Sequence, residues 1–157
     1  MLKLGKLADY ATALMTAMAS APSQVHTAQG LAGRTHVSAP TAAKLLKLLT
    51  KGGLVESLRG AHGGYRLSRS PERITVAEII SAVEGPIAVT ECSEDHSGCS
   101  MESSCATKTN WRLINRAIFE ALQAVTLAQM AAPQPVSPRR QESPIHFHPA
   151  TSMAGGR

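Results

Sequence analysis

The chain has 157 residues, which suits one domain with an extension and leaves little material for a second core. Hydrophobic residues make up 43% of it but aromatic residues only 3%, a composition that favours packed helices over a β-sandwich. The net charge is +5, and residues 1–90 hold ten basic against five acidic side chains, as expected of a surface that meets phosphates.

The first fifty residues contain three helical patterns. Apolar residues at three- and four-residue steps predict a helix over 7–19. Thr27 is a suitable N-cap for a short helix over 28–34, and the tight turn 35–37 leads into a helix over 38–51 with its serine as N-cap. Two short helices joined by a three-residue turn are typical of a helix-turn-helix.

A β-hairpin is expected next. Residues 54–58 and 65–67 show strand alternation on either side of the glycine-rich stretch 59–64. This pattern predicts a wing with Arg59 and His62 at its tip. The predicted DNA contacts are Ser38, Ala39, Pro40 and Thr41 near base edges, Lys44, Lys47, Lys51 and Arg59 at phosphates, and His62 on the wing.

The second half of the chain holds two further helical patterns. One covers 74–83 with Thr75 as a possible cap, and a longer one covers 109–130, whose apolar stripe favours self-association. The fold class expected is mainly α with a small β-hairpin wing. Its parts are a winged helix-turn-helix domain over 1–86, a cysteine-rich loop over 87–108, a long dimerisation helix over 109–131 and a disordered tail over 132–157.

All three cysteines of the chain, Cys92, Cys99 and Cys105, fall within fourteen residues of a polar, acidic segment. A disulfide would leave one thiol over, and thiolates this close together can converge on one metal centre. The alternative without a metal is that these cysteines are reactive thiols or packing residues. With His96 the segment also contains a Cys₃His set, which would suit a structural zinc ion.

Several stretches together resemble one known family. They are Leu7–Ala11, Leu31–Ala32, Arg59–Tyr65, Thr75–Glu84 and the triple-cysteine segment followed by Trp111. In this combination the sequence resembles the Rrf-type winged-helix regulators, the family of IscR, NsrR and RirA, from residue 1 to about 131. Its opening Leu-Ala-Asp-Tyr-Ala is most similar to regulators of SUF-system iron–sulfur cluster assembly. The resemblance implies a dimeric transcriptional regulator whose three cysteines hold a 4Fe–4S or 2Fe–2S cluster that alters DNA binding.

The resemblance leaves two candidates for the fourth cluster ligand. In IscR-like members a histidine follows the last cysteine by three residues, but Lys108 stands there, and a protonated amine cannot ligate at neutral pH. In NsrR-like members an aspartate in the first helix of the other subunit completes the site, and Asp9 is at the matching position. His96 is the competing candidate.

The expected function is therefore a homodimeric repressor that binds double-stranded operator DNA and senses iron–sulfur cluster status. The alternative is a zinc-stabilised winged-helix transcription factor without cluster sensing. A thiol oxidoreductase using Cys99 or Cys105 is a third possibility, but no Cys-x-x-Cys motif occurs, so no enzyme is expected. No stretch approaches the roughly 18 apolar residues of a membrane span, which favours a cytoplasmic protein without membrane contact.

Overall fold

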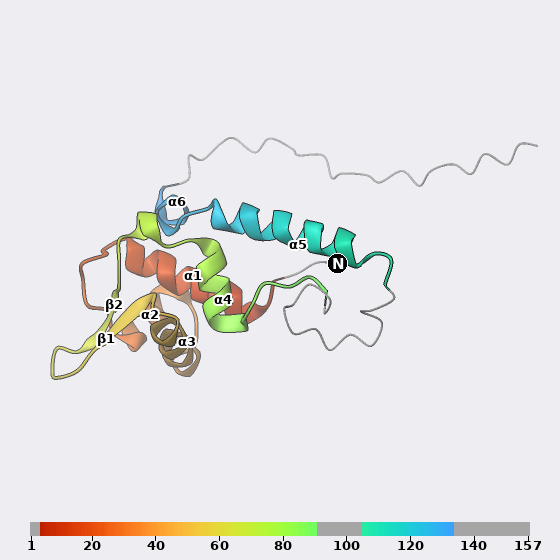
Figure 1. Cartoon of the computed structure of the whole chain (residues 1–157). Helices are drawn as coiled ribbons and strands as arrows, with labels where there is room; N and C mark the ends of the chain where they lie inside the picture. Colours follow the sequence, from red (N-terminus) through yellow and green to blue (C-terminus); the bar gives the residue numbers. More distant parts are fainter. Residues whose placement is uncertain (1–3, 91–104, 134–157) are drawn as a thin grey trace, which may run out of the picture.

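The computed structural model describes residues 4–90 and 105–133 (Figure 1). Cys92, His96, Cys99 and all but the first two residues of the predicted tail lie outside these ranges. The elements in chain order are α1 (Lys6–Ala19), α2 (Ala28–Thr35), α3 (Ala39–Lys51), β1 (Val55–Leu58), β2 (Gly64–Leu67), a 3₁₀ turn (Pro71–Arg73), α4 (Val76–Glu84), α5 (Lys108–Gln123) and α6 (Leu127–Ala131).

Helices α2 and α3 form the predicted helix-turn-helix. The Thr27 hydroxyl accepts a hydrogen bond from the backbone N–H of Gly30 at 3.0 Å, so it caps α2 as expected. His36 ends α2 in the left-handed conformation, with φ of 57°. Ser38 occupies the N-cap position of α3, but its hydroxyl is 2.7 Å from the Thr41 hydroxyl and makes no cap hydrogen bond. The predicted position of Ser38 is confirmed, whereas its predicted capping bond is not formed.

The wing is the predicted hairpin, with β1 and β2 antiparallel and Val55 opposite Leu67. A third segment joins it, because His26 and Tyr65 exchange two backbone hydrogen bonds of 2.8 Å. At Gly64, where φ is 159°, a Cβ atom would lie 2.5 Å from the His26 carbonyl oxygen, so glycine permits this close approach. The wing is therefore fixed to the chain between α1 and α2.

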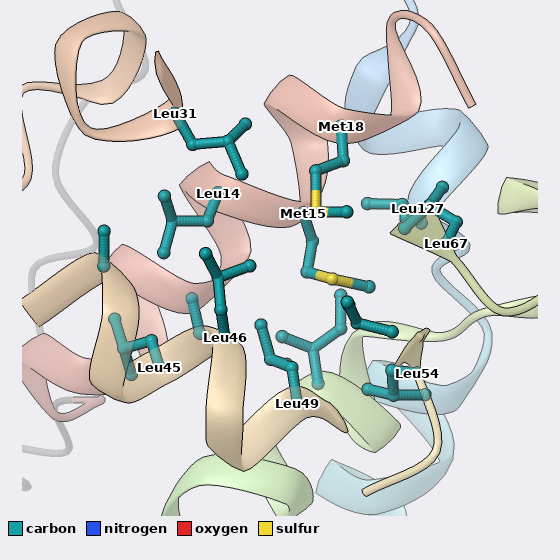
Figure 2. Packing of buried hydrophobic residues seen from close by; sticks show 14 of the residues in the cluster. Leu14, Met15, Met18, Leu31, Leu45, Leu46, Leu49, Leu54, Leu67 and Leu127 are labelled. Carbon is teal, nitrogen blue, oxygen red and sulfur yellow. The ribbon is translucent and has the colours of Figure 1, made fainter. Parts of the chain in front are cut away.

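One hydrophobic core holds these elements together. Side chains from α1, α2, α3, the wing and α6 point toward one another in its centre (Figure 2). Leu, Met, Val, Ile and Ala supply it, as the low aromatic content predicts. Its fully buried large members are Leu14, Met15, Met18, Leu31, Leu45, Leu46, Leu49, Leu54, Ile74, Ile79 and Leu127.

The structure corrects the prediction of one long C-terminal helix over 109–130. The helix ends at Gln123, and α6 begins at Leu127. Thr126 separates the two, because its hydroxyl accepts from the backbone N–H of Gln129 while the Gln129 side chain accepts from the backbone N–H of Thr126. This capping box specifies a new helix start, a signal that the apolar periodicity across the junction conceals.

The break lets the chain return to the winged-helix core. The Val76 N–H donates to the Val125 carbonyl at 2.9 Å, and the Leu127 N–H donates to the Ile74 carbonyl at 2.8 Å. These bonds form an antiparallel bridge between Thr75 and Thr126. The side chain of Leu127 is completely buried. Although the sequence assigns α6 to the association helix, α6 packs in the core of the winged-helix domain.

No helix of the described segments is both long and apolar enough to cross a membrane. The predicted fold class, mainly α with a two-stranded wing, is confirmed.

Replacing Leu127 by alanine should lower the free energy of unfolding by about 2–5 kcal/mol, because it leaves a cavity in a packed core. Urea denaturation followed by circular dichroism measures the change. Met130→Ala is the matched control in the same helix, since Met130 is 40% exposed, and it should cost much less. Equal losses in the two variants would show that α6 does not belong to the core.

Candidate nucleic-acid interface and metal-ligating residues

Helix α3 presents a basic face to solvent. Its stripe of Ala42, Leu45, Leu46 and Leu49 is buried, which turns the intervening lysines outward. Of the nine predicted DNA contacts, Thr41 is partly buried. The other eight are exposed: Ser38, Ala39, Pro40, Lys44, Lys47, Lys51, Arg59 and His62.

Ion pairing divides the basic residues of this region into two groups. Arg66 forms an ion pair with Glu56 at 2.8 Å within the wing. Arg69, which follows β2, forms an ion pair with Glu78 of α4 at 2.6 Å. Across residues 4–90 and 105–133, no ion pair involves any of the three α3 lysines or Arg59. Their charges are therefore available for phosphate contacts, which supply much of the affinity in DNA binding.

The first turn of α3 is small and carries no acidic side chain. Ala39 and Pro40 are exposed, and the hydroxyls of Ser38 and Thr41 share one hydrogen bond. Positive partial charge at a helix N-terminus favours phosphate, and short side chains allow the backbone to approach base edges. This turn has the properties that the sequence predicts for the base-reading end of α3.

Glycine geometry shapes the wing tip. Gly60 has φ of 111°, a conformation that residues with a side chain rarely adopt. At Gly63 a Cβ atom would collide with the carbonyl oxygen of Leu58. The tight tip therefore depends on these two glycines, and it carries the exposed side chains of Arg59 and His62.

Cys105 is the one predicted thiol ligand within the described residues, and it lies three residues before α5. Its sulfur is 3.3 Å from the Thr107 hydroxyl oxygen. The Thr107 side chain, assisted by the backbone N–H groups of Thr107 and Lys108 and by the Lys108 charge, lowers the pKa of Cys105 below that of an ordinary thiol. Iron and zinc bind thiolate, so this environment suits a metal ligand.

Asp9 lies on α1 with an exposed side chain. It lines a hollow of about 570 Å³ whose walls include Val76, Ile80 and Met130. Within the described residues its carboxylate makes no hydrogen bond or ion pair, and no three His, Cys, Asp or Glu side chains converge on a metal position there. Cys92, Cys99 and His96 lie outside those residues, so the metal site remains a prediction.

Two polar residues at this end of the molecule escape sequence reasoning. Thr107 stands two positions after Cys105, a spacing that could have indicated a hydrogen bond to the thiol. Asn115 uses its side-chain amide to hold the chain that leads out of α4. No local signal identifies Asn115, because its partners lie 26 and 28 residues earlier in the sequence.

Known proteins are similar to this chain in sequence and architecture. A model of the Rrf2 family, described as an iron-dependent transcriptional regulator, matches residues 4–133. Protein rrf2 of Nitratidesulfovibrio vulgaris is 33% identical over 109 residues, which cover 69% of this chain and 73% of the relative. IscR of Xenorhabdus nematophila is 39% identical over 93 residues, which cover 59% of this chain and 56% of the relative. The match thus spans little more than half the length of that IscR.

Solved structures of two regulators are also similar to this chain. CymR, the global cysteine regulator of B. subtilis, has a TM-score of 0.65 at 30% identity, covering 83% of this chain and 97% of CymR. IscR of T. potens has a TM-score of 0.63 at 33% identity, covering 82% of this chain and 85% of that structure. These proteins are regulators, so the oxidoreductase alternative is set aside. The chain belongs to the Rrf2 family of winged-helix, DNA-binding transcriptional regulators.

Proposed function

We propose that this chain forms a homodimer that binds operator DNA and represses iron–sulfur assembly or iron-responsive genes according to the occupancy of an iron–sulfur cluster. The observation that carries the proposal is the environment of Cys105. A thiol with a lowered pKa stands directly before α5, at the end of a segment that holds every cysteine of the chain. The iron-dependent family and the IscR relatives support the same reading.

Cys92, Cys99 and Cys105 are the proposed cluster ligands. Asp9 of the partner subunit is the proposed fourth ligand, because its carboxylate is exposed and makes no hydrogen bond or ion pair with the described residues. A bound 4Fe–4S or 2Fe–2S cluster would supply sensitivity to iron and oxidants. A site with one oxygen ligand among three thiolates binds its metal less firmly than an all-cysteine site, which suits a sensor.

The proposed dimer interface is α5. None of its residues is buried in the described chain, although it carries large apolar side chains. Trp111, Leu113, Ile114 and Phe119 are between 37% and 70% exposed. A helix-turn-helix protein generally reads two half-sites as a symmetric pair, so a second copy is the proposed cover for this face.

Cluster sensing requires that the two cluster states differ in DNA affinity. The cysteine segment joins α4 of the DNA-binding domain to α5 of the proposed interface. Metal ligation by its thiolates would therefore change how the DNA-binding domain is connected to the proposed dimer interface. In the zinc alternative, His96 completes a tetrahedral site with the three cysteines and the metal is structural.

The cluster hypothesis predicts that anaerobically reconstituted protein and apo protein bind one operator with affinities differing by about tenfold or more at fixed salt concentration. Replacing all three cysteines by serine should abolish the difference. Iron and acid-labile sulfide analysis provides the control for loading. Equal affinities would refute sensing, and colourless protein containing one zinc per chain would establish the alternative.

The dimer hypothesis predicts that Ile114→Glu converts the protein to a monomer, because a carboxylate would be placed in an apolar interface. Sedimentation equilibrium measures the association. Thr109→Glu introduces the same charge on α5 away from the apolar stripe and should leave the dimer intact. A monomeric wild-type protein, or an unchanged Ile114→Glu dimer, would exclude α5 as the interface.

The lowered pKa of Cys105 predicts its reactivity in metal-free protein. Thiolate is the reactive form, so alkylation of Cys105 should reach half its maximal rate at a lower pH than an ordinary cysteine. Iodoacetamide kinetics between pH 5 and 10, measured with Cys92 and Cys99 replaced by serine, test this. Thr107→Val removes the main cause of the shift and should move the profile to higher pH. An unmoved profile would contradict the assignment.

A further inference from the structure

The side chain of Asn115 on α5 holds the chain that leads out of α4 by two hydrogen bonds. Its Nδ2 donates to the Ile87 carbonyl oxygen at 3.0 Å, and its Oδ1 accepts from the Val89 N–H at 3.0 Å. Carbonyl and N–H groups two residues apart are those that one residue of a parallel strand would bond. The Asn115 side-chain amide takes the place of that residue's backbone N–H and carbonyl.

The same segment is anchored at its other end to α1. The Glu84 carboxylate accepts from the Ala8 backbone N–H at 3.3 Å, and this N–H belongs to the first turn of a helix whose N-cap, Gly5, has no capping side chain. Residues 84–89 therefore form a strap between the DNA-binding domain and α5. On one side the strap borders a hollow of about 490 Å³ lined by Ile118 and Leu122. Ile87 of the strap also packs against the apolar cluster of Ala8, Val76 and Ile80.

The strap leads directly to the first cysteine. Cys92 follows Val89 by three positions, a reach of about 10 Å at most. At the other end of the cysteine segment, Cys105 is joined to the start of α5, and Asn115 lies about 10 Å further along that helix. One helix thus holds both chain ends of the thiol-bearing segment.

We propose that Asn115 is a positioning residue for thiolate ligation: by clamping residues 87–89 on α5 it keeps the entry to the cysteine segment near Cys105. The inference rests on the proposed role of the cysteines as ligands, and it does not depend on which metal they bind. Residues that orient metal ligands commonly contribute 10–100-fold to metal affinity. Asn115 does so without touching the metal.

Asn115→Asp tests the clamp with almost no change in shape. It keeps an acceptor for the Val89 N–H but turns a carboxylate oxygen toward the Ile87 carbonyl, where no proton is available to share. Gln123→Glu is the matched control, because Gln123 is exposed on the same helix and makes no hydrogen bond or ion pair with the described residues.

The probe is Co²⁺, added anaerobically to reduced apo protein and followed by its thiolate charge-transfer absorption. We expect Asn115→Asp to weaken Co²⁺ binding by about tenfold or more, and Gln123→Glu to leave it within about twofold. Thermal unfolding of the metal-free variants monitors the fold. If Asn115→Asp is less stable, the titration is made at a temperature where circular dichroism shows it folded. A wild-type Kd measured there overturns the proposal.

A second variant approaches the clamp from the backbone. Val89→Pro removes the N–H that Asn115 accepts, and the residue before a proline prefers extended backbone. If both changes act through one clamp, the double variant should lose no more Co²⁺ affinity than the single variant that has the larger loss. Additive losses would show that Asn115 acts by another route. If the protein binds Co²⁺ tightly but takes up no iron, the cluster hypothesis is refuted, whereas the proposed role of Asn115 in thiolate ligation is not.

Discussion

The plan of the molecule depends on the antiparallel bridge between Thr75 and Thr126. Two backbone hydrogen bonds join the start of α4 to the start of α6, and each strand of the bridge leads into a helix that is capped by its own threonine. The bridge fixes the far end of α5 on the winged-helix domain, while its near end continues the cysteine segment (Figure 1). Helix α5 is therefore attached to the DNA-binding domain and is not a separate extension.

This attachment explains how one amphipathic helix can be both ordered and largely uncovered. Leu122, in its last turn, and Val125, just beyond its end, pack against Ala8, Val76 and Ile80. Trp111 and Ile114, nearer its start, remain exposed. Burial within the chain ends where the proposed interface with a second copy begins. The two surfaces share one apolar stripe, which accounts for its length in the sequence.

The sequence predicts the helix-turn-helix, the wing and α4 well because their signals are local. Thr27, the turn at His36 and the wing glycines each specify a conformation within a few residues. The exposure of the α3 lysines follows from the buried leucine stripe on the same helix. The same reasoning fails at Thr126, because apolar periodicity continues across a helix break that the capping box with Gln129 decides.

Residues whose partners are distant in sequence could not be found this way. Asn115 and Glu84 make their contacts across 26 or more residues, and nothing beside them in the chain announces a partner. The sequence identifies the cysteines by their clustering, yet the lowered pKa of Cys105 depends on the placement of Thr107 and Lys108 at the start of α5. Composition and spacing predict which atoms are available, and only the tertiary arrangement says how they are held.

The double hydrogen bond between His26 and Tyr65 has a consequence for the predicted contact of the wing with operator DNA. Ordering a flexible backbone residue costs about 1–2 kcal/mol, and a two-stranded hairpin by itself is marginally stable in water. His26 supplies a third segment at the base of the wing, so the backbone of the wing is already ordered in the folded protein. The conformational entropy of ordering it is therefore lost during folding and not on DNA binding. The backbone entropy that the wing itself loses on association is then limited to the few tip residues around Gly60, and a preformed wing favours tight binding from a small contact area.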